Sequence, residues 1–129
     1  MSAGKIFMGG AIMLAALSGM AGTAIAQDAT GVWRRPSTGT EVQFYDCSGK
    51  LCAKIVAVQD DAKKSTVGTV IMKGASKTGA GEWKGDLLNT DNNQIYSGVV
   101  KMEGPRALSL KGCVAGGLIC SGETWTKVR

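Results

Sequence analysis

Apolar and polar residues alternate with a period of two in short runs from Gly31 onward, and turn residues separate these runs. This pattern is typical of half-buried β-strands, and no stretch shows a convincing helical period. Eight strands are predicted, over residues 31–35, 41–47, 51–59, 66–74, 82–89, 94–103, 107–115 and 118–129. Because the connections are short, strands that are neighbours in sequence are expected to pair. Eight such strands form either a sandwich or a closed barrel, and closure removes both exposed edges. We therefore predict an all-β, eight-stranded antiparallel up-and-down (meander) barrel.

The clearest local signal is the stretch from Phe44 to Val56, which has the pattern of two strands joined by a tight turn. Gly49-Lys50 suits the centre of a type II′ turn, whose first central residue needs a positive φ. This turn places Cys47 opposite Cys52, within reach of a disulfide bond. One face of the hairpin then carries only apolar residues and is expected to point inward: Val42, Phe44, Ala53, Ile55 and Ala57.

A second hairpin is predicted near the C-terminus, with Gly116-Gly117 as its two-residue turn. This turn places Cys113 opposite Cys120. Four cysteines allow three connectivities, and the spacing favours two local disulfides, Cys47–Cys52 and Cys113–Cys120. A zinc site built from the four thiolates is the alternative, but the ligand spacing of a zinc knuckle is absent. We expect no metal site.

The first 26 residues have the features of a secretory signal peptide. Lys5 supplies a positive charge, residues 6–20 are apolar, and Ala24-Ile25-Ala26 matches an A-x-A cleavage site. The apolar run is short and interrupted by Gly, so it is not expected to remain as a membrane-spanning helix. We predict a signal peptide over 1–26 and one small domain over 27–129, periplasmic or secreted, where disulfides form.

The basic residues are spread along the chain, whose formal net charge is +5. The only adjacent basic pairs are Arg34-Arg35 and Lys63-Lys64. Because nucleic-acid binding needs a basic patch, no nucleic-acid partner is expected, although weak attraction to an anionic envelope component stays open. The outward face of the first hairpin holds Gln43 and Lys54, so the barrel is not expected to span a membrane.

Several short segments resemble one bacterial family. They are Gly31-Val32-Trp33, the block from Cys47 to Val56, Tyr96, Gly112-Cys113, Cys120 and the closing Thr124 to Arg129. In these segments the chain resembles the family called domain of unknown function 2147. The resemblance implies a secreted, lipocalin-like (calycin-like) small barrel and supplies no activity.

The Gly-X-Trp at the start and Arg129 at the end are also similar to the wider lipocalin and avidin-like barrels. That similarity implies that a basic residue from the last strand covers Trp33. One segment departs from the family of unknown function: residues 60–66 lack the Pro and Arg that its members often carry after the third strand.

The chain contains no His, which removes Ser-His-Asp and Cys-His catalysis. Its cysteines are expected to be oxidised, and no phosphate-binding or dinucleotide-binding motif is present. We therefore expect no enzyme, no catalytic residue and no cofactor.

Five residues are candidates for a ligand site: Trp33, Trp83, Tyr96, Glu123 and Trp125. In the predicted last hairpin, Leu110 lies opposite Glu123 and Leu108 opposite Trp125, so Glu123 shares an apolar face. One alternative is a carboxylate that orients a ligand near a barrel mouth. The others are a bulge or register shift that puts Glu123 in water, or pairing with a nearby cation such as Arg129, Arg35 or Lys84. The four aromatic residues either fill the core or stack on a ligand.

The function expected from these observations is non-catalytic binding of a small apolar or amphipathic molecule, or of an envelope component, in a preformed cavity. The alternative is a structural or protein-interaction module of the cell envelope with a fully packed core.

Overall fold

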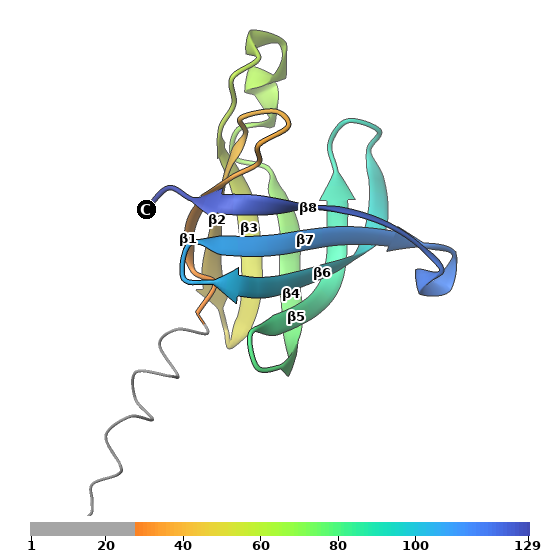
Figure 1. Cartoon of the computed structure of the whole chain (residues 1–129). Coiled ribbons are helices and arrows are strands. Elements are labelled where there is room, and N and C mark those ends of the chain that lie inside the picture. The colour runs from red at the N-terminus through yellow and green to blue at the C-terminus, as the bar shows by residue number, and fades with distance from the viewer. Residues whose placement is uncertain (1–27) are drawn as a thin grey trace, which may run out of the picture.

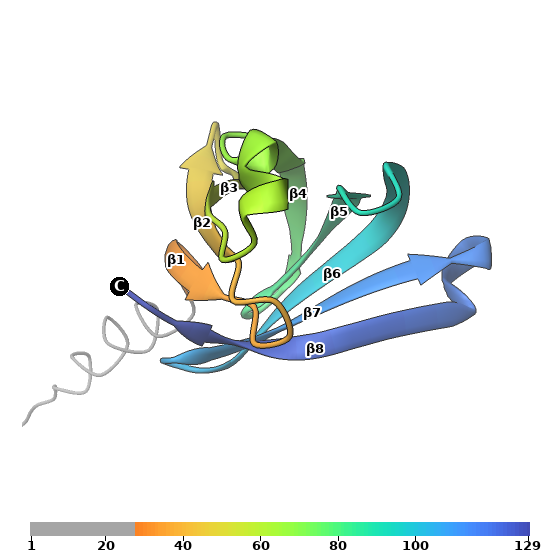
Figure 2. The ribbon, with the colours of Figure 1, turned by 90° about the horizontal axis from the view of Figure 1, so that it is seen from above.

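The computed structural model describes residues 28–129, so the predicted signal peptide, residues 1–26, lies outside the described residues. The chain forms eight strands: β1 (Gly31–Arg34), β2 (Glu41–Cys47), β3 (Lys50–Ala57), β4 (Val70–Gly79), β5 (Glu82–Asn89), β6 (Gln94–Gly104), β7 (Ala107–Val114) and β8 (Ile119–Lys127). All pairs are antiparallel, and the strands follow one another around a closed barrel in which β8 returns to β1 (Figures 1 and 2). The predicted meander barrel is confirmed.

The strand β4 differs most from its prediction. It begins at Val70 rather than residue 66, because the preceding segment Asp61–Thr66 forms a short 3-10 helix, η2, above the barrel. The Asp60 side chain caps this helix by accepting a hydrogen bond from the Ala62 backbone N–H at 3.0 Å. A polar connection was predicted here, and its side chains become part of the site described below.

The other end of β4 lies within residues 75–81, the segment expected to connect two strands. The strand continues to Gly79, because Ala75 is fully buried and pairs with Leu51 of β3. The small and polar residues of this segment suggested a turn. Residues 76–79 are instead exposed positions at the end of β4. The remaining strand boundaries agree with the predictions to within two residues.

The first hairpin has the predicted faces and a different turn. Ser48 and Gly49 both have positive φ, 60° and 83°, as a type I′ turn requires. The register is therefore shifted by two residues: Cys47 lies opposite Lys50, and Cys52 opposite Tyr45. A shift of two keeps every side chain on its face, and Val42, Phe44, Ala53 and Ile55 are buried as predicted, while Ala57 at the strand end is half-buried.

Both predicted disulfides are present. Cys47–Cys52 joins diagonal positions with Cα atoms 5.9 Å apart, and Cys113–Cys120 joins directly opposed residues with Cα atoms 4.1 Å apart. The second hairpin keeps its predicted register, but its tip is a four-residue loop around the 3-10 segment η3 (Ala115–Gly117) rather than a two-residue turn.

The barrel closes between its first and last strands. Trp33 pairs with Lys127 and Arg34 with Thr126, while the Val32 N–H donates to the Arg129 carbonyl at 2.8 Å and the Val128 N–H to the Val32 carbonyl at 2.7 Å. Gly31 is required here, because its φ is 130° and a Cβ atom would lie 2.8 Å from the Arg129 carbonyl oxygen.

Trp33 anchors the core beside this closure. It is fully buried, and its indole N–H donates to the Ala29 carbonyl at 2.9 Å. A basic residue from β8 covers Trp33 as the resemblance implied, but this residue is Lys127 and not Arg129. Lys127, directly opposite Trp33, places its Nζ 5.7 Å from the ring centroid, whereas the Arg129 side chain is 69% exposed and extends toward Glu41.

No helix within residues 28–129 is long and apolar enough to cross a membrane. Trp83 and Trp125 are buried in the same core as Trp33, and Tyr96 is half-buried.

Closure can be tested by removing Lys127–Arg129, which deletes the last paired residue and the three backbone hydrogen bonds beyond it without touching Trp125. We expect the melting temperature to fall by roughly 10 °C or more and the transition to broaden, because β1 and β8 become free edges. Arg129→Ala is the control, since it keeps the backbone carbonyl and loses only an exposed ion pair. An unchanged melting curve for the truncated protein would show that β1–β8 pairing does not hold the fold together.

Candidate functional site

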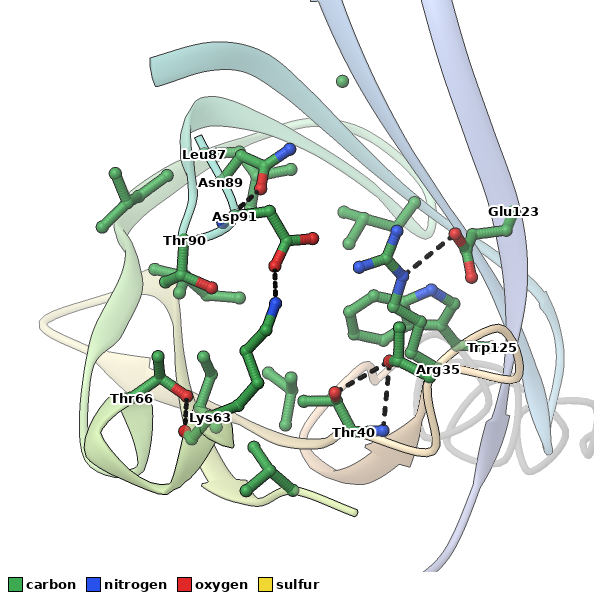
Figure 3. Close-up of a pocket in the computed structure, with 18 of the residues that line it drawn as sticks. Arg35, Thr40, Lys63, Thr66, Leu87, Asn89, Thr90, Asp91, Glu123 and Trp125 are labelled. Carbon is green, nitrogen blue, oxygen red and sulfur yellow. Dashed lines mark hydrogen bonds and ion pairs between the residues drawn. The ribbon is translucent and has the colours of Figure 1, made fainter. Parts of the chain in front are cut away.

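A pocket of about 380 Å³ opens at one end of the barrel (Figure 3). Its mouth is formed by the β1–β2 loop, by η2 with the Asp60 cap, and by the β5–β6 turn. Strands β7 and β8 supply one wall. Three connections that are remote in sequence therefore meet around one opening, as is common where a β-barrel holds a ligand.

The interior wall of the pocket is apolar and its rim is polar. The apolar lining comes from strands around the barrel: Val42, Ile55, Val58, Ile71, Leu87, Leu88, Leu110 and Trp125. The charged side chains in the lining are two cations, Arg35 and Lys63, and three anions, Asp60, Asp91 and Glu123. An amphipathic molecule would match this division, with its apolar part inside and its polar part at the rim.

Glu123 lies on the pocket wall and is already engaged by two neighbours. The Arg35 Nε donates to its Oε2 at 3.0 Å, and the Ser37 hydroxyl donates to both carboxylate oxygens at 3.1 and 3.3 Å. The predicted register, with Leu110 opposite Glu123, is what brings this carboxylate to the interior face. Glu123 therefore faces the pocket and is the partner of Arg35, while its role in orienting a ligand stays a prediction.

A second ion pair crosses the mouth from η2 to the β5–β6 turn, where Lys63 donates to Asp91 (Figure 3). The hydrogen bond from Lys63 lowers the pKa of the Asp91 carboxyl, partial burial opposes this effect, and the charges of Lys63 and Arg35 add to it. That Arg35 acts on Asp91 means that the two ion pairs share one electrostatic environment across the opening.

Trp125 carries the unusual polar group of this site. Its side chain is buried and packs edge-on against Phe44, with ring centroids 6.2 Å apart. Its indole Nε1 is the one buried side-chain nitrogen or oxygen of residues 28–129 that has no hydrogen-bond partner. An unsatisfied buried donor costs about 1–3 kcal/mol, which makes this position a candidate contact for a bound acceptor.

The structure brings together some of the predicted site residues. Glu123, Trp125 and Tyr96 line the pocket. The Tyr96 hydroxyl accepts a hydrogen bond from Asn92 Nδ2 at 2.8 Å. Trp33 and Trp83 do not line it and belong to the packed core. Alternation along a strand predicts which aromatic side chains point into the barrel. It does not predict whether such a side chain lies in the packed core or lines the pocket.

Of the five charged pocket residues only Glu123 was predicted as a site residue, and Arg35, Asp60, Lys63 and Asp91 were not. Arg35 was considered only as a partner of Glu123. Lys63 lies in η2 and Asp91 in the β5–β6 turn, and the approach of these two segments depends on the closed barrel. A weak signal existed, because charged residues next to strand ends commonly form the rim of a barrel. No three His, Cys, Asp or Glu side chains gather as metal ligands in the part of the chain from residue 28 onward.

The ion pair at the mouth generates a titration prediction. In Lys63→Met, the Asp91 pKa should rise toward the ordinary aspartate value of about 3.9, because its principal hydrogen bond is lost. Lys64→Met is the matched control, since Lys64 pairs instead with Asp61 at 3.3 Å. Carboxyl-detected NMR titration measures both variants. An unchanged Asp91 pKa in Lys63→Met would contradict the assigned pair.

The sign of the pH effect follows from the lowered pKa. The pair stabilises the folded protein fully above the ordinary aspartate pKa, and this contribution disappears as pH falls through the lowered value. Because the two side chains are 45% and 50% exposed, we expect it to be at most about 1 kcal/mol.

Comparison with known proteins supports both the fold and the family. A structure described as "Protein HP1028 from the human pathogen Helicobacter pylori belongs to the lipocalin family" superposes with a TM-score of 0.64 and 18% identity, covering 79% of this chain and 84% of that one. At this identity the likeness shows the fold alone. A search of curated proteins finds no match. The model of a family described as uncharacterized protein conserved in bacteria matches residues 31–127. The chain therefore belongs to this family, domain of unknown function 2147.

Proposed function

We propose that this protein is a non-catalytic binding protein for a small apolar or amphipathic molecule, held in the open end of the barrel. The observation that carries the proposal is the pocket of about 380 Å³, because its apolar wall and charged rim match the two parts of an amphipathic ligand. Ligand pockets span about 300–1,000 Å³, so the volume suits a compact ligand or the end of a longer chain.

The lipocalin-like architecture supports this function, since eight-stranded barrels of this kind have an interior just large enough for one small ligand. The two disulfides fit an oxidising compartment, and we propose the periplasm or the exterior of a bacterial cell as the place of action. In that setting the ligand is a molecule of the envelope or one that passes through it.

A second candidate function, a protein-interaction module, is favoured by the tip of the β7–β8 hairpin. There Leu118 is 86% exposed and Ile119 is 64% exposed beyond the Cys113–Cys120 bridge. Figure 1 shows this hairpin extending away from the rest of the barrel. This function needs no occupied pocket, so the binding experiment below separates the two candidates.

Titration with N-phenylnaphthylamine, an uncharged fluorescent probe, tests the proposed function. We expect a saturable increase in probe emission and a higher melting temperature, because a ligand that prefers the native state stabilises it by mass action. Leu88→Phe fills part of the apolar wall and should weaken binding about tenfold, a change of roughly 1.4 kcal/mol.

Leu118→Phe is the matched control, because it makes the same substitution at the exposed hairpin tip and should leave the affinity unchanged. Equal weakening by both substitutions would place the probe outside the pocket. If the probe does not saturate, the binding function fails and the interaction module replaces it.

A further inference from the structure

We propose that the ligand carries an uncharged acceptor oxygen, an ester or amide carbonyl, that binds at Trp125 Nε1 with the Arg35 guanidinium beside it. This inference rests on the proposed binding function and adds the chemical class of the ligand's polar end. It depends on which polar groups around the pocket already have partners and which do not.

Two donors on this wall, the Trp125 indole N–H and the Arg35 guanidinium, lack a full set of partners. Glu123 accepts from Arg35 and Ser37 with both of its oxygens. The Trp125 indole has only an N–H to offer, and within residues 28–129 that N–H has no partner. The Arg35 side chain makes one hydrogen bond to these residues, through Nε, so its two terminal nitrogens also remain donors. A ligand atom that satisfies both groups must therefore be an acceptor.

The position of Trp125 makes a shared contact geometrically reasonable. Glu123 and Trp125 are two residues apart on β8 and so point to the same face of the strand, roughly 7 Å apart along it. Arg35 is held at Glu123, and Figure 3 shows the Trp125 ring on the same side of the pocket as this ion pair. The indole N–H is shielded from solvent, so an acceptor reaches it when a neighbouring side chain moves. In the proposal Arg35 makes this movement, because its side chain is long and 36% exposed.

The charge of the rim decides between a carboxylate and an uncharged acceptor. Two cations face three anions among the lining residues, and both cations are already paired, Arg35 with Glu123 and Lys63 with Asp91. A ligand carboxylate would add a further negative charge to a rim that already has an excess of one. A carbonyl oxygen satisfies the same donors without that repulsion.

The test compares three ligands with the same chain: decanamide, decanoate and decane, each displacing N-phenylnaphthylamine at pH 7. We expect decanamide to bind roughly threefold to tenfold more tightly than either of the others, the range of one net hydrogen bond. In Trp125→Phe this advantage over decane should disappear. Trp83→Phe is the control, because Trp83 lies in the core and does not line the pocket.

A measurement on the unsubstituted protein avoids any loss of packing in Trp125→Phe. In nitrogen-15 NMR, the Trp125 indole signal should move downfield with decanamide and stay nearly in place with decane. The Trp33 indole N–H is bonded to the Ala29 carbonyl, so its signal serves as an internal reference.

Each outcome has one meaning. Tighter binding of decanoate than of decanamide overturns the proposal in favour of an anionic ligand. Equal binding of all three with an unmoved Trp125 signal overturns it while leaving the binding function intact. If no ligand displaces the probe and the probe itself does not saturate, the binding function fails and this inference fails with it.

Discussion

The pairing of β1 with β8 is the constraint on which the rest of the structure depends. It is short, with two paired positions and three further backbone hydrogen bonds at Val32. Its position matters more than its length, because Arg35 follows β1 directly and is carried to Glu123 on β8. Closing the barrel therefore also assembles the wall of the pocket, from residues separated by 88 positions in the chain. Fold stability and the geometry of the site are consequences of the same contact.

The site combines a rigid interior with a rim held by weak interactions. Trp125 is fixed by Phe44 and by Leu108 opposite it on β7, whereas the two ion pairs at the mouth are partly exposed. Exposed ion pairs contribute little to stability and break at small cost. Such a rim can open for a ligand while the barrel stays intact, which is the behaviour that a binding protein needs. The Cys47–Cys52 disulfide lies at the end of the barrel opposite the mouth, whereas Cys113–Cys120 joins β7 and β8 next to the lining residues Gly112 and Ser121.

The barrel fold could be predicted from the sequence because the alternation of apolar and polar residues and the residues of tight turns are local signals. The sequence specified the inward face of the first hairpin correctly even though the turn lies one residue earlier, since a register shift of two leaves both faces unchanged. It placed Glu123 and Trp125 on the interior face of β8, and the structure lines the pocket with both.

The sequence was insufficient where position depends on distant packing. Ala75 gave no strand signal because its burial comes from the closed barrel. The approach of Lys63 to Asp91 joins η2 to the β5–β6 turn, 28 positions apart in the chain. The unpartnered Trp125 N–H was equally hidden, because the partners of an indole nitrogen cannot be read from alternation.

Anomalous diffraction from crystals grown with a terminally brominated decanamide tests the central claim most directly, since it locates the ligand without assuming a site. The account predicts a single bromine position inside the barrel, against the apolar wall near Ile71 and Leu88 and across from β8. It also predicts the amide oxygen within hydrogen-bond distance of Trp125 Nε1. Bromine found only outside the barrel at saturating ligand, with the pocket side chains unchanged, would contradict it.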